Sequence, residues 1–116
     1  MYKCKLKTMP YAQCEVLIEP HEIGIIVTLR SYNTDVVSLS FVNGDLNSVW
    51  FGCVNYSPTT ARHVNRFTTE WLGWNAYHYA KENKGLNWLD DMSGDGSEEV
   101  KRIAGRVLSE YLKGVV

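Results

Sequence analysis

The feature that most constrains the fold is a change of hydrophobic period at Ser57-Pro58, where a two-residue period gives way to a helical one. Proline fits the first position of a helix because its missing N–H would have no partner there, and the serine before it can cap the free amides. Beyond this point, residues suited to burial recur mostly on one helical face: Ala61, Val64, Phe67, Thr68, Trp71 and Leu72. We therefore expect strands before Ser57 and helices after it.

The first half of the chain has the composition and spacing of strands. The expected strands cover residues 2–8, 13–19, 23–32, 36–42 and 48–56. The third of these is almost wholly apolar, which is typical of a strand buried on both faces, whereas the fourth alternates and buries one face. Pro20 is expected to end the second strand, and Asn43-Gly44-Asp45 predicts a tight hairpin turn because Asn and Gly tolerate a positive φ.

The second half has helical spacing. Gly73 is expected to end the first helix through a left-handed cap, and a short second helix is expected over residues 76–83. The last helix is expected to begin after Ser97 as N-cap, with Glu98 and Glu99 in its first turn. The predicted fold is α+β: an antiparallel sheet of about five strands, mostly a meander, with two or three C-terminal helices packed on one face.

Length and charge limit the classes of function. A chain of 116 residues, 45% hydrophobic, can form a single domain over residues 1–116, strand-rich over 1–56 and helical over 57–116. A net charge of −1 argues against the global attraction to phosphate of a generic nucleic-acid binder, but it allows a local basic patch. No apolar run reaches the length of a membrane span, and no signal-peptide pattern opens the chain. Three cysteines without CxxC spacing favour a reducing compartment, so a cytoplasmic protein is expected.

Motifs for catalysis or metal binding are weak. The stretch 91–97 resembles the first half of an EF-hand loop, but Arg102 stands where calcium needs a bidentate glutamate. Cys53 and His63 would suit a thiol and its base, but no third member of such a site is evident. The three histidines lack the spacing of zinc ligands. We therefore expect no catalytic residue, no metal and no cofactor.

Two groups of residues are candidates for binding a partner. Aromatic residues crowd a short span, more than two short helices can easily bury, and carboxylates follow them. This first candidate surface, for a protein partner, consists of Trp74, Tyr77, Trp88, Asp90, Asp91 and Asp95. The second candidate, for phosphates, consists of Arg30, Arg62 and Arg66. The alternatives are a satellite core for the aromatics, and a solvated helix face with Arg66 paired to Glu70 for the arginines.

Residues between Ser31 and Phe67 resemble a known group of proteins. The pattern is Ser31-Tyr32-Asn33-Thr34-x-Val36, followed about twenty residues later by Tyr56-Ser57-x-Thr59-Thr60-x-Arg62-His63-x-Asn65. It resembles small proteins encoded by bacteriophages and prophages, which usually have no assigned function. Pro58 departs from the pattern, since these sequences often have a basic residue there. By analogy, the resemblance implies an inhibitor of a host defence nuclease, such as an anti-CRISPR protein.

These observations lead to one leading hypothesis and two alternatives. The leading hypothesis is a non-enzymatic phage-type accessory protein that binds and inhibits a host defence protein, such as a CRISPR effector nuclease, through the aromatic and acidic surface. Such a protein would act in the host cytoplasm, and an aromatic surplus is compatible with a homodimer. The alternative is a nucleic-acid-binding accessory protein that uses the arginines. A small enzyme using Cys53 and His63 ranks last.

Overall fold

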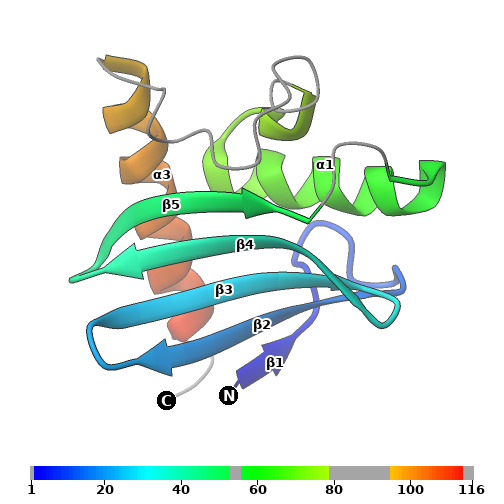
Figure 1. Cartoon of the computed structure of the whole chain (residues 1–116), viewed down its shortest axis with the longest axis horizontal. Helices are drawn as coiled ribbons and strands as arrows, with labels where there is room; N and C mark the ends of the chain where they lie inside the picture. The colour runs from blue at the N-terminus through cyan, green and yellow to red at the C-terminus, as the bar shows by residue number, and fades with distance from the viewer. Residues whose placement is uncertain (1, 53–55, 79–94, 114–116) are drawn as a thin grey trace.

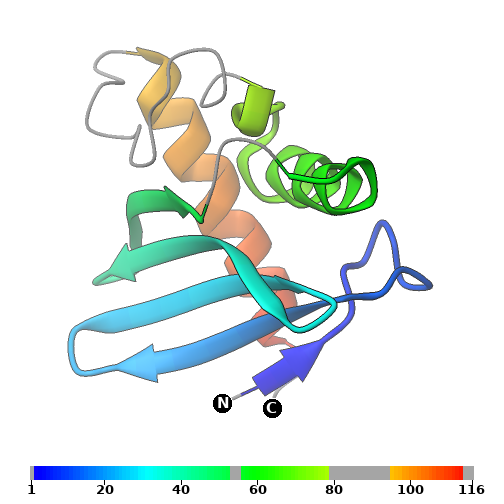
Figure 2. The same ribbon diagram turned by 45° about the vertical axis from the view of Figure 1, so that its right-hand side comes forward.

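Five antiparallel strands form a meander, and helices cover one side of it (Figures 1 and 2). The computed structural model describes residues 2–52, 56–78 and 95–113, with the backbone alone at 95–97. The strands lie in the sheet in chain order: β1 (Tyr2–Cys4), β2 (Cys14–His21), β3 (Gly24–Ser31), β4 (Thr34–Val42) and β5 (Asp45–Phe51). The helices are α1 (Pro58–Leu72) and α3 (Asp95–Leu112), and residues 76–78 are also helical. The predicted α+β meander is confirmed.

The two faces of the sheet differ because side chains alternate along every strand. One row of paired residues on the face toward the helices crosses all five strands: Tyr2, Ile18, Val27, Leu39 and Val49. The corresponding row on the other face is more polar: Lys3, Leu17, Thr28, Ser38 and Trp50. There the Thr28 and Ser38 hydroxyls form a hydrogen bond of 3.1 Å across the strands. The prediction that β3 is buried on both faces is wrong, since Ile26, Thr28 and Arg30 are only half-buried.

Strand limits differ from the predicted ones where neighbouring strands decide them. β1 stops at Cys4 instead of residue 8. β2 continues through Pro20 to His21, because beyond Ile18 it pairs with β3 alone among the described residues, and proline is tolerated at an unpaired edge. β5 begins at Asp45, directly after the Asn43-Gly44 turn, whose two residues have φ values of 53° and 89° as the hairpin prediction requires.

The ends of α1 follow the prediction. The Ser57 side chain accepts a hydrogen bond of 3.3 Å from the Thr60 N–H, and Pro58 occupies the first turn. Gly73 has a φ of 83°, and its N–H donates to the Thr69 carbonyl over 3.0 Å. The prediction for α3 is wrong at its start, since the helix begins at Asp95, before the expected cap Ser97. An acidic residue in the first turn suits the positive end of the helix dipole.

Trp71 joins the sheet to both helices. Its side chain is fully buried, and its ring lies 6.5 Å from that of Phe41 in β4 and 5.7 Å from that of Phe67 in α1. It stacks on Tyr111 of α3 with ring centroids 4.8 Å apart. Aromatic pairs of this kind add about 0.5–1.5 kcal/mol each beyond the burial of their area. The hydrophobic stripe predicted for α1 is thus the stripe that contacts the sheet and α3.

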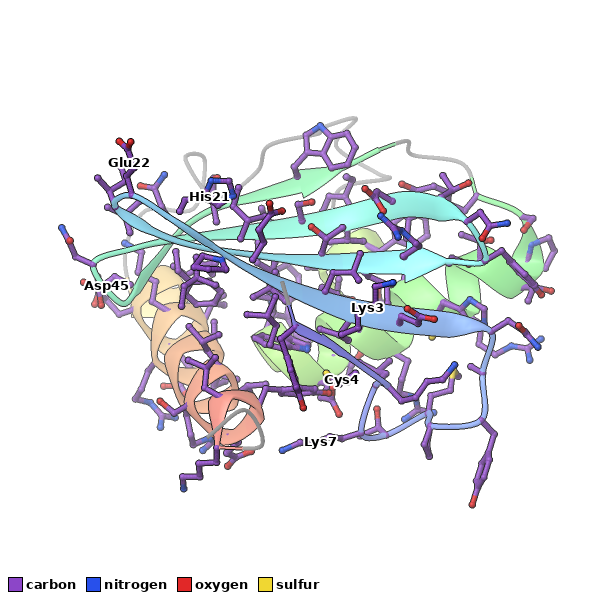
Figure 3. The ribbon with its side chains drawn as sticks, turned by 90° about the horizontal axis from the view of Figure 1, so that it is seen from below. Lys3, Cys4, Lys7, His21, Glu22 and Asp45 are labelled. Carbon is purple, nitrogen blue, oxygen red and sulfur yellow. The ribbon has the colours of Figure 1, made fainter. Side chains whose placement is uncertain are left out.

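A second junction, which we name the Tyr111–Glu70 clasp, attaches the loop after β1 to both helices. The Tyr111 hydroxyl donates to Glu70 Oε2 over 2.5 Å and accepts from the Lys7 N–H over 2.9 Å. The Thr8 N–H donates to Glu70 Oε1 over 3.0 Å, so both carboxylate oxygens have partners. Burial and the bond to Glu70 raise the pKa of Tyr111 well above its usual value. Figure 3 shows Lys7 and Cys4 on the helix side of the sheet.

We expect Tyr111→Phe to lower the free energy of unfolding by about 1–3 kcal/mol, because the loss of the hydroxyl leaves the Lys7 N–H and one Glu70 oxygen without partners. Urea denaturation followed by tryptophan fluorescence measures this. Tyr11→Phe is the matched control, since Tyr11 is 99% exposed, and its unfolding midpoint should not change. Equal midpoints for the two variants would show that the clasp does not stabilise the fold.

Candidate functional site

The outer side of α1 carries a hollow with two arginines. We name this surface the arginine face and define it as Arg62, Asn65, Arg66 and Thr69, which line, among the described residues, a hollow of about 260 Å³. The face exists because α1 buries its opposite stripe against the sheet, which directs Arg62, Arg66 and Thr69 outward, while Asn65 between them is half-buried. Arg62 and Arg66 are four residues apart, so their side chains are neighbours on the helix, and both are exposed.

The expected pairing of Arg66 with Glu70 does not form, and that prediction is wrong. Glu70 instead accepts hydrogen bonds from Tyr111 and Thr8 in the clasp. Within residues 2–52, 56–78 and 98–113, neither Arg62 nor Arg66 forms an ion pair. Two exposed arginines thus line one hollow on α1 without a carboxylate of the described chain to neutralise them.

Arg30 is separated from the other two arginines. Its neighbours Leu29 and Ser31 point into the core, so Arg30 lies on the sheet face that the helices leave uncovered. Its Nε donates to Asp35 Oδ1 over 2.8 Å. That hydrogen bond and the Asp35 charge raise the pKa of Arg30. The structure therefore does not bring together the three arginines that the sequence predicts as one site.

A buried hydrogen-bond network fixes α1 to the end of β3. Ser31 Oγ lies 2.8 Å from His63 Nδ1 and 3.2 Å from Thr60 Oγ1. Ser31 and His63 are only 2% and 4% exposed. Burial, and then the positive charge of Arg62, lower the pKa of His63, so the imidazole is neutral at neutral pH. The network therefore fixes the part of α1 that carries Arg62 relative to the sheet.

Residues of the sequence pattern meet at this junction. Besides Ser31, Thr60 and His63, the pattern includes Tyr56, whose hydroxyl donates to the Val36 carbonyl over 2.6 Å. The pattern therefore describes how the β3–β4 hairpin holds the start of α1. Sequence reasoning treated His63 as a partner for Cys53 and missed Ser31 and Thr60, although the spacing of the pattern contained both residues.

The predicted aromatic and acidic surface is only partly described, and one of its residues, Tyr77, is buried. Tyr77 is 3% exposed, and its ring lies 6.0 Å from Phe51 and 5.6 Å from Tyr56. Its hydroxyl also accepts a hydrogen bond of 3.1 Å from the Tyr56 N–H, so the prediction that Tyr77 is presented to a partner is wrong and the satellite-core alternative applies to it. Trp74 is half-buried. The remaining predicted residues lie outside the described side chains: Trp88, Asp90, Asp91 and Asp95.

The described serine, histidine and cysteine side chains that could act in catalysis are not arranged as a reactive site. The Ser31–His63 pair has the contact that a nucleophile and its base require, but a substrate cannot reach atoms so deeply buried. Burial raises the pKa of the Cys4 and Cys14 thiols, which opposes formation of a reactive thiolate. Cys53, the predicted thiol partner of His63, lies outside the described residues.

Metal-ligating side chains do not gather in the described part of the chain. It contains no group of three or more His, Cys, Asp or Glu side chains that could hold a metal ion. His21, Glu22 and Asp45 lie at the hairpin tips, at the end of the sheet away from the β3–β4 turn (Figures 1 and 3). None of the described helices is long and apolar enough to cross a membrane.

Comparison with known proteins adds no identity, because no protein-family model, curated protein or solved structure matches this chain. The function must therefore be inferred from the geometry of the arginine face and of the junction beneath it.

The buried His63 predicts that stability falls with acidity. The unfolded chain takes up a proton on this side chain below its ordinary pKa of 6.5, whereas the folded chain resists protonation until a lower pH. The free energy of unfolding should therefore decrease as the pH falls below about 6.5 and level off below the folded pKa. Urea denaturation over a pH series measures this slope.

The matched pair for this experiment is His63→Asn and His21→Asn. Asparagine places a polar atom near the position of Nδ1 and does not titrate, so His63→Asn should flatten the pH dependence even if it lowers stability overall. His21 is exposed, and its substitution should leave the slope as in the native protein. The same slope in His63→Asn as in the native protein would contradict the role given to His63.

Proposed function

We propose that this protein binds the phosphate backbone of a nucleic acid through the arginine face. The observation that supports this proposal most is the pair Arg62 and Arg66, exposed one turn apart beside a hollow of about 260 Å³ while Glu70 is engaged in the clasp. A guanidinium group presents a planar set of donors that matches phosphate oxygens, often in a bidentate contact. Thr69 adds an exposed hydroxyl, a group that commonly contacts phosphate and sugar.

The positive end of the α1 dipole lies at the start of the helix, and there it favours an anion, as the arginines do. The first turn of the helix contains no acidic residue, so the positive end of its dipole is not offset there. Arg62 lies just after this turn. Because the whole chain has a net charge of −1, the attraction is local, and binding depends on these few contacts instead of on overall charge.

The resemblance to phage proteins supplies the biological setting of the proposal. An accessory protein of this kind would meet viral or host nucleic acid in the infected cell. Inhibition of a host defence nuclease through the aromatic and acidic surface stays a prediction of the sequence, and Tyr77 no longer belongs to that surface. The arginine face is preferred because its two exposed cations line one hollow and Glu70, engaged in the clasp, does not pair with them.

We expect Arg62→Ala and Arg66→Ala each to weaken binding of a labelled oligonucleotide. Each should also reduce the steepness of log K against log salt by about 0.7 for a single strand or 0.9 for a duplex, because one phosphate contact is lost. Fluorescence anisotropy titrations at several salt concentrations measure both quantities.

Two other arginines provide matched controls. Arg30→Gln removes a cation that pairs with Asp35 on the uncovered sheet face, and Arg106→Ala removes an exposed cation from α3. Neither should alter affinity or salt dependence. An unchanged salt slope in the Arg62→Ala, Arg66→Ala double variant, or an equal loss in Arg106→Ala, would refute the proposed function.

A further inference from the structure

Tyr32 presents an aromatic ring to solvent from a conformation that tyrosine rarely adopts. It lies in the two-residue turn between β3 and β4, with a φ of 56° and a side chain that is 56% exposed. Positive φ is uncommon outside glycine, and asparagine and aspartate are the residues that tolerate it best. A bulky side chain at such a position costs stability, so backbone strain here is a reason to look for a function.

The surrounding contacts hold the Tyr32 ring in one place. The Tyr32 N–H donates to the Gln13 carbonyl over 2.8 Å, which fixes the backbone of the turn. The preceding residue, Ser31, is bound to His63 and Thr60 in the buried network. The Tyr32 ring itself lies 5.9 Å from the His63 ring, tilted by 43°. One side of the ring thus rests on α1 while more than half of the side chain stays in solvent.

The Tyr32 ring and the arginine face are neighbours through His63. Arg62 adjoins His63 in the chain, and Arg66 lies three residues further along α1, a spacing that places side chains next to each other on a helix. The buried His63 is therefore a common neighbour of the exposed Tyr32 ring and of the two exposed arginines. A ring for a base and cations for phosphates thus both adjoin this one residue of α1.

We propose that Tyr32 is a stacking platform for an unpaired base, so that the nucleic acid bound by the arginine face is single-stranded. This inference rests on the proposed function and specifies its ligand. A single strand offers its base faces, which stack on aromatic rings with little sequence preference, whereas a duplex buries them in its own stack. A preorganised ring also loses little conformational entropy when a base binds to it.

The test compares a short fluorescein-labelled oligo(dT) with a blunt duplex of the same length in anisotropy titrations. The native protein should bind the single strand more tightly. Tyr32→Asn should weaken single-strand binding roughly fivefold to a hundredfold, as expected for one lost stacking contact, and leave duplex binding unchanged. Tyr32→Phe keeps the ring and should retain the affinity. Trp50→Leu, on the uncovered sheet face, is the aromatic control and should bind normally.

Tyr32→Asn is chosen because asparagine tolerates the positive φ, so the variant should fold, and thermal unfolding verifies this.

A measurement on the native protein is independent of any variant: ultraviolet cross-linking to a bromodeoxyuridine single strand should give an adduct on Tyr32 by mass spectrometry. Equal or tighter duplex binding, full single-strand affinity in Tyr32→Asn, or adducts only elsewhere would overturn the inference. If the Tyr32 results are negative but Arg62→Ala and Arg66→Ala still lose affinity, the proposed function stands without this inference. If the arginine variants also keep their affinity, the proposed function and this inference both fail.

Discussion

The buried hydrogen bond between Ser31 and His63 links the sheet to α1, the helix that carries the arginine face. It connects the last residue of β3 to the first half of α1, and its burial makes it sensitive to the loss of either partner. With α1 held in this way, Arg62 and Arg66 point away from the sheet and Tyr32 lies against the imidazole. The buried polar pair thus helps to position both the arginine face and the Tyr32 ring.

The Tyr111–Glu70 clasp makes a complementary contribution from the other end of α1. An exposed pair of Arg66 with Glu70 would be worth only about 0.3–0.5 kcal/mol, so stronger hydrogen bonds to Tyr111 and Thr8 readily displace it. By engaging Glu70, the clasp leaves the arginine face without a carboxylate from its own helix. A tertiary contact that stabilises the fold thereby sets the charge of the neighbouring surface of the same helix.

Sequence alone predicts the local features of this fold and misses those that depend on distant partners. Ser57-Pro58, Asn43-Gly44 and Gly73 act within a few residues of their own positions, so the start of α1, the β4–β5 turn and the end of α1 are predicted correctly. The path of β2 through Pro20 and the burial of Tyr77 depend on neighbouring elements. Glu70 meets residues 41 and 62 positions away, and no local pattern indicates that contact. The site is predictable only in part, since Arg62 and Arg66 form one surface whereas Arg30 does not join them.

The central claim is that the start of α1 and the turn beside it form one surface for nucleic acid. Titration of the ¹⁵N-labelled full chain with oligo(dT), followed by two-dimensional NMR, tests it most directly because every backbone amide reports at once. The account predicts that the largest shift changes lie at residues 32–33 and 62–69, with little change at Trp50 or Arg30 on the uncovered sheet face. Changes concentrated on that sheet face, or no change at saturating oligonucleotide, would contradict it.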